Sequence, residues 1–74
     1  MVEPKPIQKG VYRHFKGGLY EVVDTVIDSE TLETMVLYRP LGNPWWWVRP
    51  YAMFTETVES DGKRVLRFQL EEAQ

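Results

Sequence analysis

Residues 45–50 read Trp-Trp-Trp-Val-Arg-Pro, and this stretch decides the fold of the chain. Pro50 disfavours helical backbone angles at the residue before it, and Pro44 stands just ahead of the run. A helix is therefore a poor interpretation of the stretch, and we predict an extended strand. So much indole surface in one strand indicates that the rest of the chain folds around it.

The two faces of this predicted strand carry different residues. Successive side chains of a strand point to opposite faces, so Trp45, Trp47 and Arg49 are predicted to share one face. Trp46 and Val48 share the other, which we assign to the core. Each indole can bury about 150–250 Å², so two exposed together would form a patch near the largest found on ordinary monomers. We therefore expect the face of Trp47 and Arg49 to be covered by a neighbouring segment or used for binding.

The sequence around this stretch shows short β-rich runs separated by turn-forming residues, mainly Gly, Pro, Asp, Asn and Ser. The predicted strands span residues 11–15, 19–27, 33–39, 45–49, 55–59 and 64–70. Proline at position 50 is well placed to start a short helical or 3₁₀ turn over residues 51–54. The run 19–27 is the longest and is predicted to be a central, curved strand.

These runs predict an all-β domain that closes on itself or packs as two small sheets. Our first choice is a small SH3-like barrel of about five or six short antiparallel strands with one short helical or 3₁₀ turn. An OB-fold ranks second, because it usually needs more residues and a longer helix. Residues 10–70 are assigned to the single domain. Residues 1–9 are predicted to be a flexible lead-in, and residues 71–74 a frayed C-terminus.

Length and composition limit the classes of protein that the sequence can encode. A chain of 74 residues without cysteine and with one histidine offers no disulfide and no thiolate or His-rich metal site, so we expect neither a metal nor a cofactor. No apolar run approaches the roughly 20 residues needed to cross a bilayer. We expect a soluble, cytoplasmic protein without a membrane partner. The net charge of −2 gives no general attraction to nucleic acid.

Several separated motifs resemble a known family. They are His14-Phe15-Lys16-Gly17, Tyr20-Glu21-Val22, Ser29-Glu30-Thr31, Val36-Leu37-Tyr38, Trp47-Val48-Arg49-Pro50 with Phe54, and Arg67-Phe68. In this order they are similar to the bacterial domain-of-unknown-function 1653 family, over nearly all of residues 10–70. The resemblance implies an SH3-like small barrel and no assigned activity. This chain departs from the family pattern in having Trp46 where a leucine usually stands.

The leading hypothesis for function is a non-catalytic binding module with an aromatic and arginine surface. An arginine beside indoles can stack on a ring and still present its donors to a carboxylate or phosphate. The candidate ligand-binding residues are His14, Lys16, Glu30, Tyr38, Trp45, Trp47, Arg49 and Arg67. The ligand would be an extended peptide, a small anionic molecule or single-stranded nucleic acid, the last disfavoured by the acidic net charge. The structural alternative for Arg49 is an internal pair with Glu30.

Other interpretations stay open at this level. A small enzyme or enzyme accessory would use His14 with Glu30, and with Ser29 as nucleophile, but residue types alone do not make such a site and we assign no catalytic residue. The Lys16-Gly17-Gly18 segment could bind phosphate, although a hairpin turn explains the glycines more simply. A self-associating structural domain would bury the spare indoles across a two-fold axis, giving an oligomer.

Overall fold

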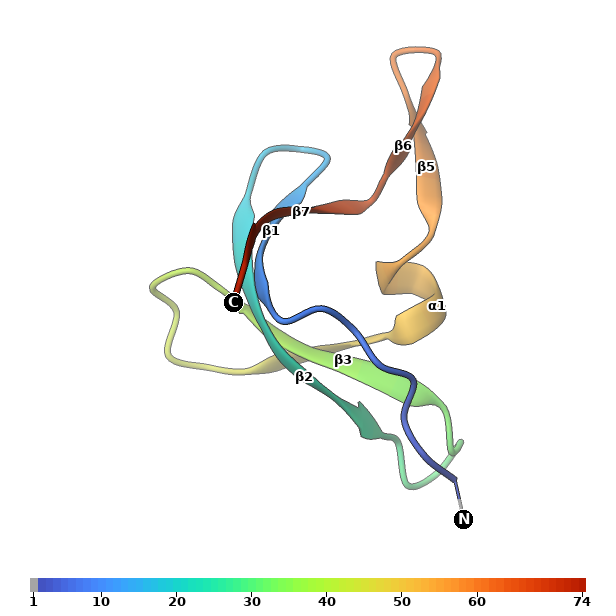
Figure 1. The fold of residues 1–74 in the computed structure, drawn as a ribbon. Coiled ribbons are helices and arrows are strands. Elements are labelled where there is room, and N and C mark those ends of the chain that lie inside the picture. Colours follow the sequence, from blue (N-terminus) through green and yellow to red (C-terminus); the bar gives the residue numbers. More distant parts are fainter. Residues whose placement is uncertain (1) are drawn as a thin grey trace.

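The computed structural model describes residues 2–74, and Met1, the first residue of the predicted lead-in, lies outside them. The elements follow one another along the chain as β1 (Gly10–His14), β2 (Leu19–Ile27), β3 (Thr34–Pro40), β4 (Trp47–Pro50), α1 (Tyr51–Phe54), β5 (Thr57–Ser60), β6 (Lys63–Leu66) and β7 (Phe68–Ala73). Five strands form an antiparallel sheet in the order β4-β3-β2-β1-β7, and β5 and β6 form a separate hairpin. The hairpin projects away from the larger sheet (Figure 1).

The predicted all-β fold, with antiparallel strands and one short helical turn, is confirmed. The strand predicted over residues 64–70 is divided into β6 and β7 by a bend at Arg67. The Arg67 N–H donates to the carbonyl oxygen of Glu56, and the Arg67 carbonyl accepts the N–H of Phe15. One chain segment thus leaves the hairpin and enters the five-stranded sheet, which gives seven strands in two sheets. In residues 2–74 the strands do not close into a complete barrel.

The core lies on the inner, concave face of the larger sheet. Its buried members are Tyr12, Val22, Val36, Tyr38, Phe54 and Phe68. Phe54 comes from α1, the one-turn helix that covers the sheet beside β3 and β4. Phe54 is stacked on Phe68 at 4.0 Å between ring centroids and is only 1% exposed. The helical turn that follows Pro50 therefore supplies the central side chain of the core.

The central strand β2 contains an irregularity at Val23, where its pairing with β3 shifts register between Val22 and Asp24. The extra residue reverses the alternation, so Val22 and Thr25 are both buried whereas Val26 is exposed. A β-bulge bends and twists a strand in this way. It confirms the predicted curvature, and it explains why simple alternation through residues 19–27 gave two half-apolar faces.

Both ends of the described chain are attached to the domain. Before β1, residues 2–9 form no helix or strand, but the Lys5 carbonyl accepts the Thr25 hydroxyl at 2.7 Å and the Gln8 carbonyl accepts the Tyr12 hydroxyl at 2.6 Å. At the other end, β7 continues to Ala73, and the Gln74 N–H donates to the Lys9 carbonyl at 2.9 Å. Residues 71–73 therefore belong to a strand, where fraying was predicted, because β1 offers them a backbone partner.

The tryptophan stretch differs from its prediction in two respects. The strand begins at Trp47, because the Asn43 side chain accepts the Trp45 N–H and holds the preceding residues in a turn. The predicted alternation of faces holds from Trp47 onward, but the inner face is the one that carries Trp47. The core assignment of Trp46 and Val48 is wrong, since they are 43% and 56% exposed.

The physical reason for the exposed Trp46 lies on the outer face of the sheet. The Arg39 guanidinium carbon lies 4.1 Å from the centre of the Trp46 ring, and the Arg39 Nε donates to a carboxylate oxygen of Glu21 at 3.0 Å. An indole covered by a guanidinium gains contact area and a cation–π interaction without entering a core. The contact with Arg39 therefore stabilises the Trp46 ring without burial in the core.

Candidate functional site

An aromatic cluster occupies the inner face of the larger sheet. Trp47 of β4 is the cross-strand partner of Tyr38 on β3, and their ring centroids are 6.0 Å apart. Tyr20 of β2 lies 6.2 Å from Trp47 and 5.4 Å from Phe68 of β7. His14 of β1 completes the row, at 4.9 Å from Phe68 with its ring edge-on. The rings thus come from neighbouring strands and form one aromatic surface, which ends at the exposed edge strand β4.

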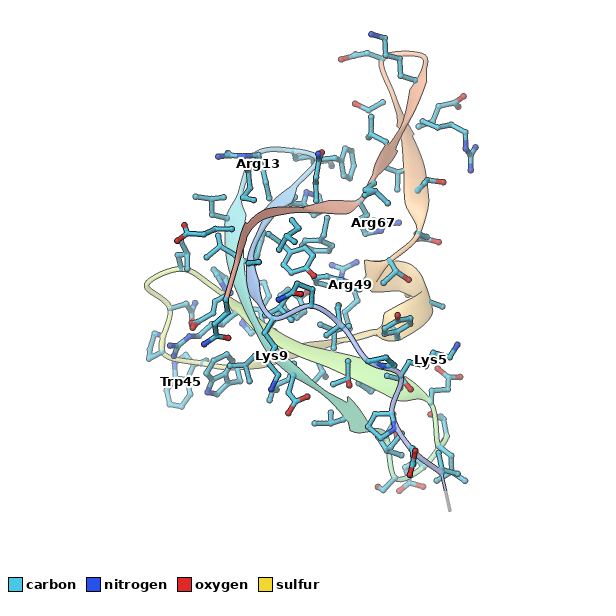
Figure 2. All side chains as sticks on the ribbon, in the orientation of Figure 1. Lys5, Lys9, Arg13, Trp45, Arg49 and Arg67 are labelled. Carbon is cyan, nitrogen blue, oxygen red and sulfur yellow. The ribbon has the colours of Figure 1, made fainter. Side chains whose placement is uncertain are left out.

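Arg49 lies on the same inner face, as the cross-strand partner of Val36. Its Nε donates to the Tyr38 hydroxyl at 3.2 Å, and its guanidinium carbon lies 5.6 Å from the centre of the Phe68 ring. The predicted partner Glu30 is elsewhere, so the internal Arg49–Glu30 pair is wrong. Within residues 2–74, Arg49 forms no ion pair with any carboxylate. Figure 2 shows its side chain between the sheet and α1. The result is a half-buried positive charge held by a neutral hydroxyl.

His14 lies beside this charge at the end of β1. Its Nδ1 accepts the N–H of Lys16 at 3.1 Å, which leaves Nε2 as the other ring nitrogen. Partial burial lowers the pKa of His14 from its ordinary value, and the positive charges of Arg49, Arg67 and Lys16 lower this pKa further. The chain is acidic in total, yet the surroundings of this imidazole are positive. Lys16, Arg49 and Arg67 were grouped with His14 as candidate site residues from the sequence, and the structure brings their charges near this imidazole.

The lowered pKa makes the stability of the domain sensitive to acid. Folding favours neutral His14, so its contribution is complete above the unfolded value of about 6.5 and is lost as the pH falls through and below that value. The free energy of unfolding of the parent should therefore decrease more between about pH 8 and about pH 5 than that of His14→Gln. Urea unfolding of both proteins measures the difference. Equal losses in the two proteins would contradict the environment assigned to His14, since they differ only in the side chain at this position.

The structure separates His14 from Glu30 by the whole length of β2. The His14 N–H donates to Gly18, just before β2 begins, whereas Glu30 lies in the turn after β2 ends at Ile27. Nine residues of strand span roughly 30 Å at about 3.3 Å each. In that turn the Glu30 N–H is accepted by the Asp28 carboxylate, as in a local turn motif. An acid–base pair of His14 and Glu30, and the nucleophile Ser29 with it, are therefore wrong.

Arg67 is brought near the cluster but is occupied by structural contacts. Its Nε donates to the Met53 carbonyl at 3.1 Å, and its Nη2 is paired with the Glu56 carboxylate. These bonds attach the bend between β6 and β7 to the end of α1. Arg67 contributes charge to the surroundings of His14, but its donors are largely used within the fold.

The remaining residues predicted for the site, Trp45 and Lys16, lie at the margins of the aromatic cluster. Trp45 is 74% exposed in the loop before β4, and Lys16 is exposed in the β1–β2 turn. That turn is closed by backbone bonds, with the Gly17 N–H donating to His14, and Gly17 has a φ of 109°. The hairpin interpretation of the two glycines is thus the correct one. Sequence reasoning missed Tyr20 and Phe68 as site residues, because only the strand order and register place Tyr20 beside Trp47 and Phe68 beside Tyr20 and His14.

Fold and site together define a class of protein: a small antiparallel β domain whose concave sheet carries aromatic rings, an arginine without a carboxylate partner in the described residues 2–74, and a histidine of lowered pKa. Among the helices of residues 2–74 none could cross a membrane. The family model described as "Protein of unknown function (DUF1653)" matches residues 10–70, and the chain belongs to this family.

A solved structure of the same family is similar to this chain. It is the crystal structure of a DUF1653 protein from Bordetella bronchiseptica, 29% identical in sequence. The match covers 88% of this chain and 87% of that one, with a TM-score of 0.79. Among curated proteins none matches. The predicted family is therefore confirmed, and its function is unknown.

Proposed function

We propose that this protein is a non-catalytic binding module that recognises an oxyanion, a carboxylate or a phosphate, on an aromatic ligand. The observation that carries the proposal is the guanidinium of Arg49, half-buried on the inner face without a carboxylate partner within residues 2–74. A charge removed from water is costly unless an opposite charge or several hydrogen bonds compensate it. Tyr38 supplies one bond to Nε, which leaves the two terminal nitrogens for a ligand.

The neighbours of Arg49 favour an anion over any other ligand charge. The guanidinium presents paired donors whose geometry fits the two oxygens of a carboxylate or phosphate. Lys16 adds positive potential on the same side, as the lowered pKa of His14 reflects. An anion bound there would also stabilise the protonated imidazole. We therefore expect the pKa of His14 to rise when such a ligand binds.

The exposed aromatic ring of Trp47 sets a second requirement, which is a planar group on the ligand. Trp47 is 43% exposed and packs on Tyr20 and Tyr38, so its ring is held in one orientation while part of its face is open to solvent. A planar ligand would stack on this indole while its oxyanion meets Arg49. Trp45, in the loop before β4, would extend the contact. Glu30 and Arg67 have no part in this proposal.

Benzoate, phenyl phosphate and the neutral isostere benzamide are probes of this site. We expect benzoate or phenyl phosphate to quench tryptophan fluorescence and to raise the pKa of His14 in an NMR titration, with benzamide much weaker. Arg49→Gln should weaken oxyanion binding by about tenfold or more, because charge-assisted bonds contribute roughly 1.5–3 kcal/mol. Arg39→Gln on the outer face removes the same charge and should bind like the parent.

Several outcomes would overturn this proposal. Benzamide binding as well as benzoate would show that the charge of Arg49 is not used. An Arg49→Gln or Trp47→Ala protein that no longer folds would assign these residues to structure alone. A single-stranded oligonucleotide that binds with far higher affinity than the small anions would replace the proposed ligand class.

A cytoplasmic location belongs to the same proposal and is supported by the absence of cysteine.

A second candidate function is self-association. Four large apolar residues in or beside the edge strand β4 are exposed, namely Trp45, Trp46, Trp47 and Val48. An exposed apolar edge strand is a ready site for pairing with a second copy, and isologous pairing would bury these side chains across a two-fold axis. Sedimentation at high protein concentration tests this candidate, and a monomer would exclude it. Val48→Lys, which charges the outer face, should dissociate any dimer formed there.

A further inference from the structure

A cleft lies between the β1–β2 turn and the β5–β6 hairpin, and His14 is among its lining residues. Its volume is about 410 Å³, within the range of roughly 300–1,000 Å³ usual for ligand sites. Its two walls are formed by Arg13, His14 and Phe15 on one side and by Lys63, Val65 and Leu66 on the other. One wall of this cleft is therefore the strand β6.

The strand β6 is paired on one edge only. Its partner is β5, and in residues 2–74 no backbone hydrogen bond reaches the opposite edge of residues 63–66. Pairing of the continuing strand with β1 begins at Phe68, opposite His14. The free edge of β6 therefore borders the cleft.

The turn of the hairpin fixes which backbone groups point into the cleft. Asp61 and Gly62 both have positive φ, 50° and 76°, as in the two-residue type I′ turn that their sequence predicts. Ser60 and Lys63 then form the hydrogen-bonded pair next to the turn. Because hydrogen-bonded and non-bonded pairs alternate in an antiparallel ladder, the N–H and C=O groups of Arg64 and Leu66 point away from β5.

We propose that the free edge of β6 docks an extended, acidic segment of a partner protein by β-strand addition. Main-chain hydrogen bonds to Arg64 and Leu66 would hold the segment, and alternate side chains would give specificity. Val65, Phe15 and Leu66, the last 46% exposed, offer apolar surface to one set of side chains. This site is independent of the oxyanion site at Arg49, although His14 borders both.

The charges of the cleft determine the chemistry of the segment. Lys63 lines the cleft from β6, next to Arg64, and neither forms an ion pair within residues 2–74. Arg13, which is paired with Glu71, lines the cleft from β1, and Asp61 of the hairpin turn is the one carboxylate among its lining residues in the described chain. Acidic residues at alternate positions of the segment would meet these cations. A second copy of β6 in this place would bring Lys63 and Arg64 of the two chains together, and like charges across strands are destabilising. The charge pattern therefore favours an acidic partner over a dimer.

A peptide of alternating glutamate and valine is the direct probe. In an NMR titration of the labelled protein, the amide signals of Arg64 and Leu66 should shift, and their hydrogen exchange should slow. A peptide with lysine in place of glutamate should bind about fivefold or more weakly. The glutamate peptide with alternate backbone nitrogens methylated should lose most of its affinity, because it cannot complete the ladder.

Two variants with the same change in net charge test the charge argument. Lys63→Glu should weaken binding of the glutamate peptide by about fivefold and should strengthen binding of the lysine peptide. Lys5→Glu, near the opposite end of the molecule (Figure 2), changes the net charge equally and should leave both unchanged. Each of four results would overturn the proposal: no binding at millimolar peptide, equal binding of the methylated peptide, shifts centred on β4, or a dimer paired through β6.

Discussion

A protein with Phe54 replaced by alanine is expected to lose a large part of the free energy of unfolding of the parent domain. The Phe54 ring is 1% exposed, stacks on Phe68 at 4.0 Å, and meets the edges of Tyr12 and Tyr38 at 5.6 and 5.3 Å. Replacing a buried phenylalanine with alanine costs about 3–5 kcal/mol. At roughly 0.05–0.15 kcal/mol per residue, a chain of 74 residues is stable by about 4–11 kcal/mol in total.

Urea unfolding followed by tryptophan fluorescence and circular dichroism measures this loss. The matched control is Met53→Ala, one residue earlier in α1, because its side chain is 43% exposed. We expect the control to lose no more than about 1 kcal/mol. A Phe54→Ala protein as stable as the control would contradict the assignment of Phe54 to the centre of the core. The result also matters for the site, since α1 is attached to Arg67 through the Met53 carbonyl.

The second large effect is expected from Gly10→Ala. Gly10 begins β1 between β2 and β7, with Val22 and Ala73 as its cross-strand partners. Its φ is 146°, and a Cβ at this position would lie 2.2 Å from the carbonyl oxygen of Glu72. Backbone atoms of a paired strand cannot move aside as a flexible side chain does. Backbone strain and overpacking of about 1–3 kcal/mol each predict a loss of about 2–6 kcal/mol.

Gly62→Ala separates the two causes of the Gly10 effect. Gly62 also has positive φ, 76°, but a Cβ added there would meet no neighbouring atom within 4 Å. The free energy of unfolding of Gly62→Ala should therefore fall by about 1 kcal/mol, from backbone strain alone. Thermal or urea unfolding of the two variants gives the comparison. If Gly10→Ala were no less stable than Gly62→Ala, the close approach of β1 and β7 at this residue would be refuted.

Much of the fold follows from local sequence. The Asp61-Gly62 dipeptide predicts its hairpin because both positions need positive φ, and Gly17 fits its turn for the same reason. The short helical turn after Pro50 was predictable, since proline ends one strand and can begin such a turn. Residues also alternate along β3, where Val36 and Tyr38 are buried on one face. These features depend on residues within a few positions of one another.

The candidate site was predictable only in part. The pairing of Trp47 with Arg49 on one face follows from strand periodicity, and the structure brings His14 and Tyr38 to them. Glu30 is excluded because the length of β2 lies between it and His14. Tyr20 and Phe68 belong to the site because the order of the strands in the sheet brings the two side chains, from β2 and β7, into one aromatic cluster. Distances between strands depend on register and order, which no single segment contains.

The sequence by itself determined the alternation of the tryptophan strand, the positions of most turns and the family of the protein. Only the tertiary structure decided which face of that strand is inside. Two faces of similar apolar character cannot be told apart locally, because burial depends on what packs against them. Here Tyr20 and Tyr38 pack against Trp47 from the inside, whereas Arg39 covers Trp46 from outside. The same long-range packing leaves Arg49 without a carboxylate partner in residues 2–74, and the proposed function rests on that.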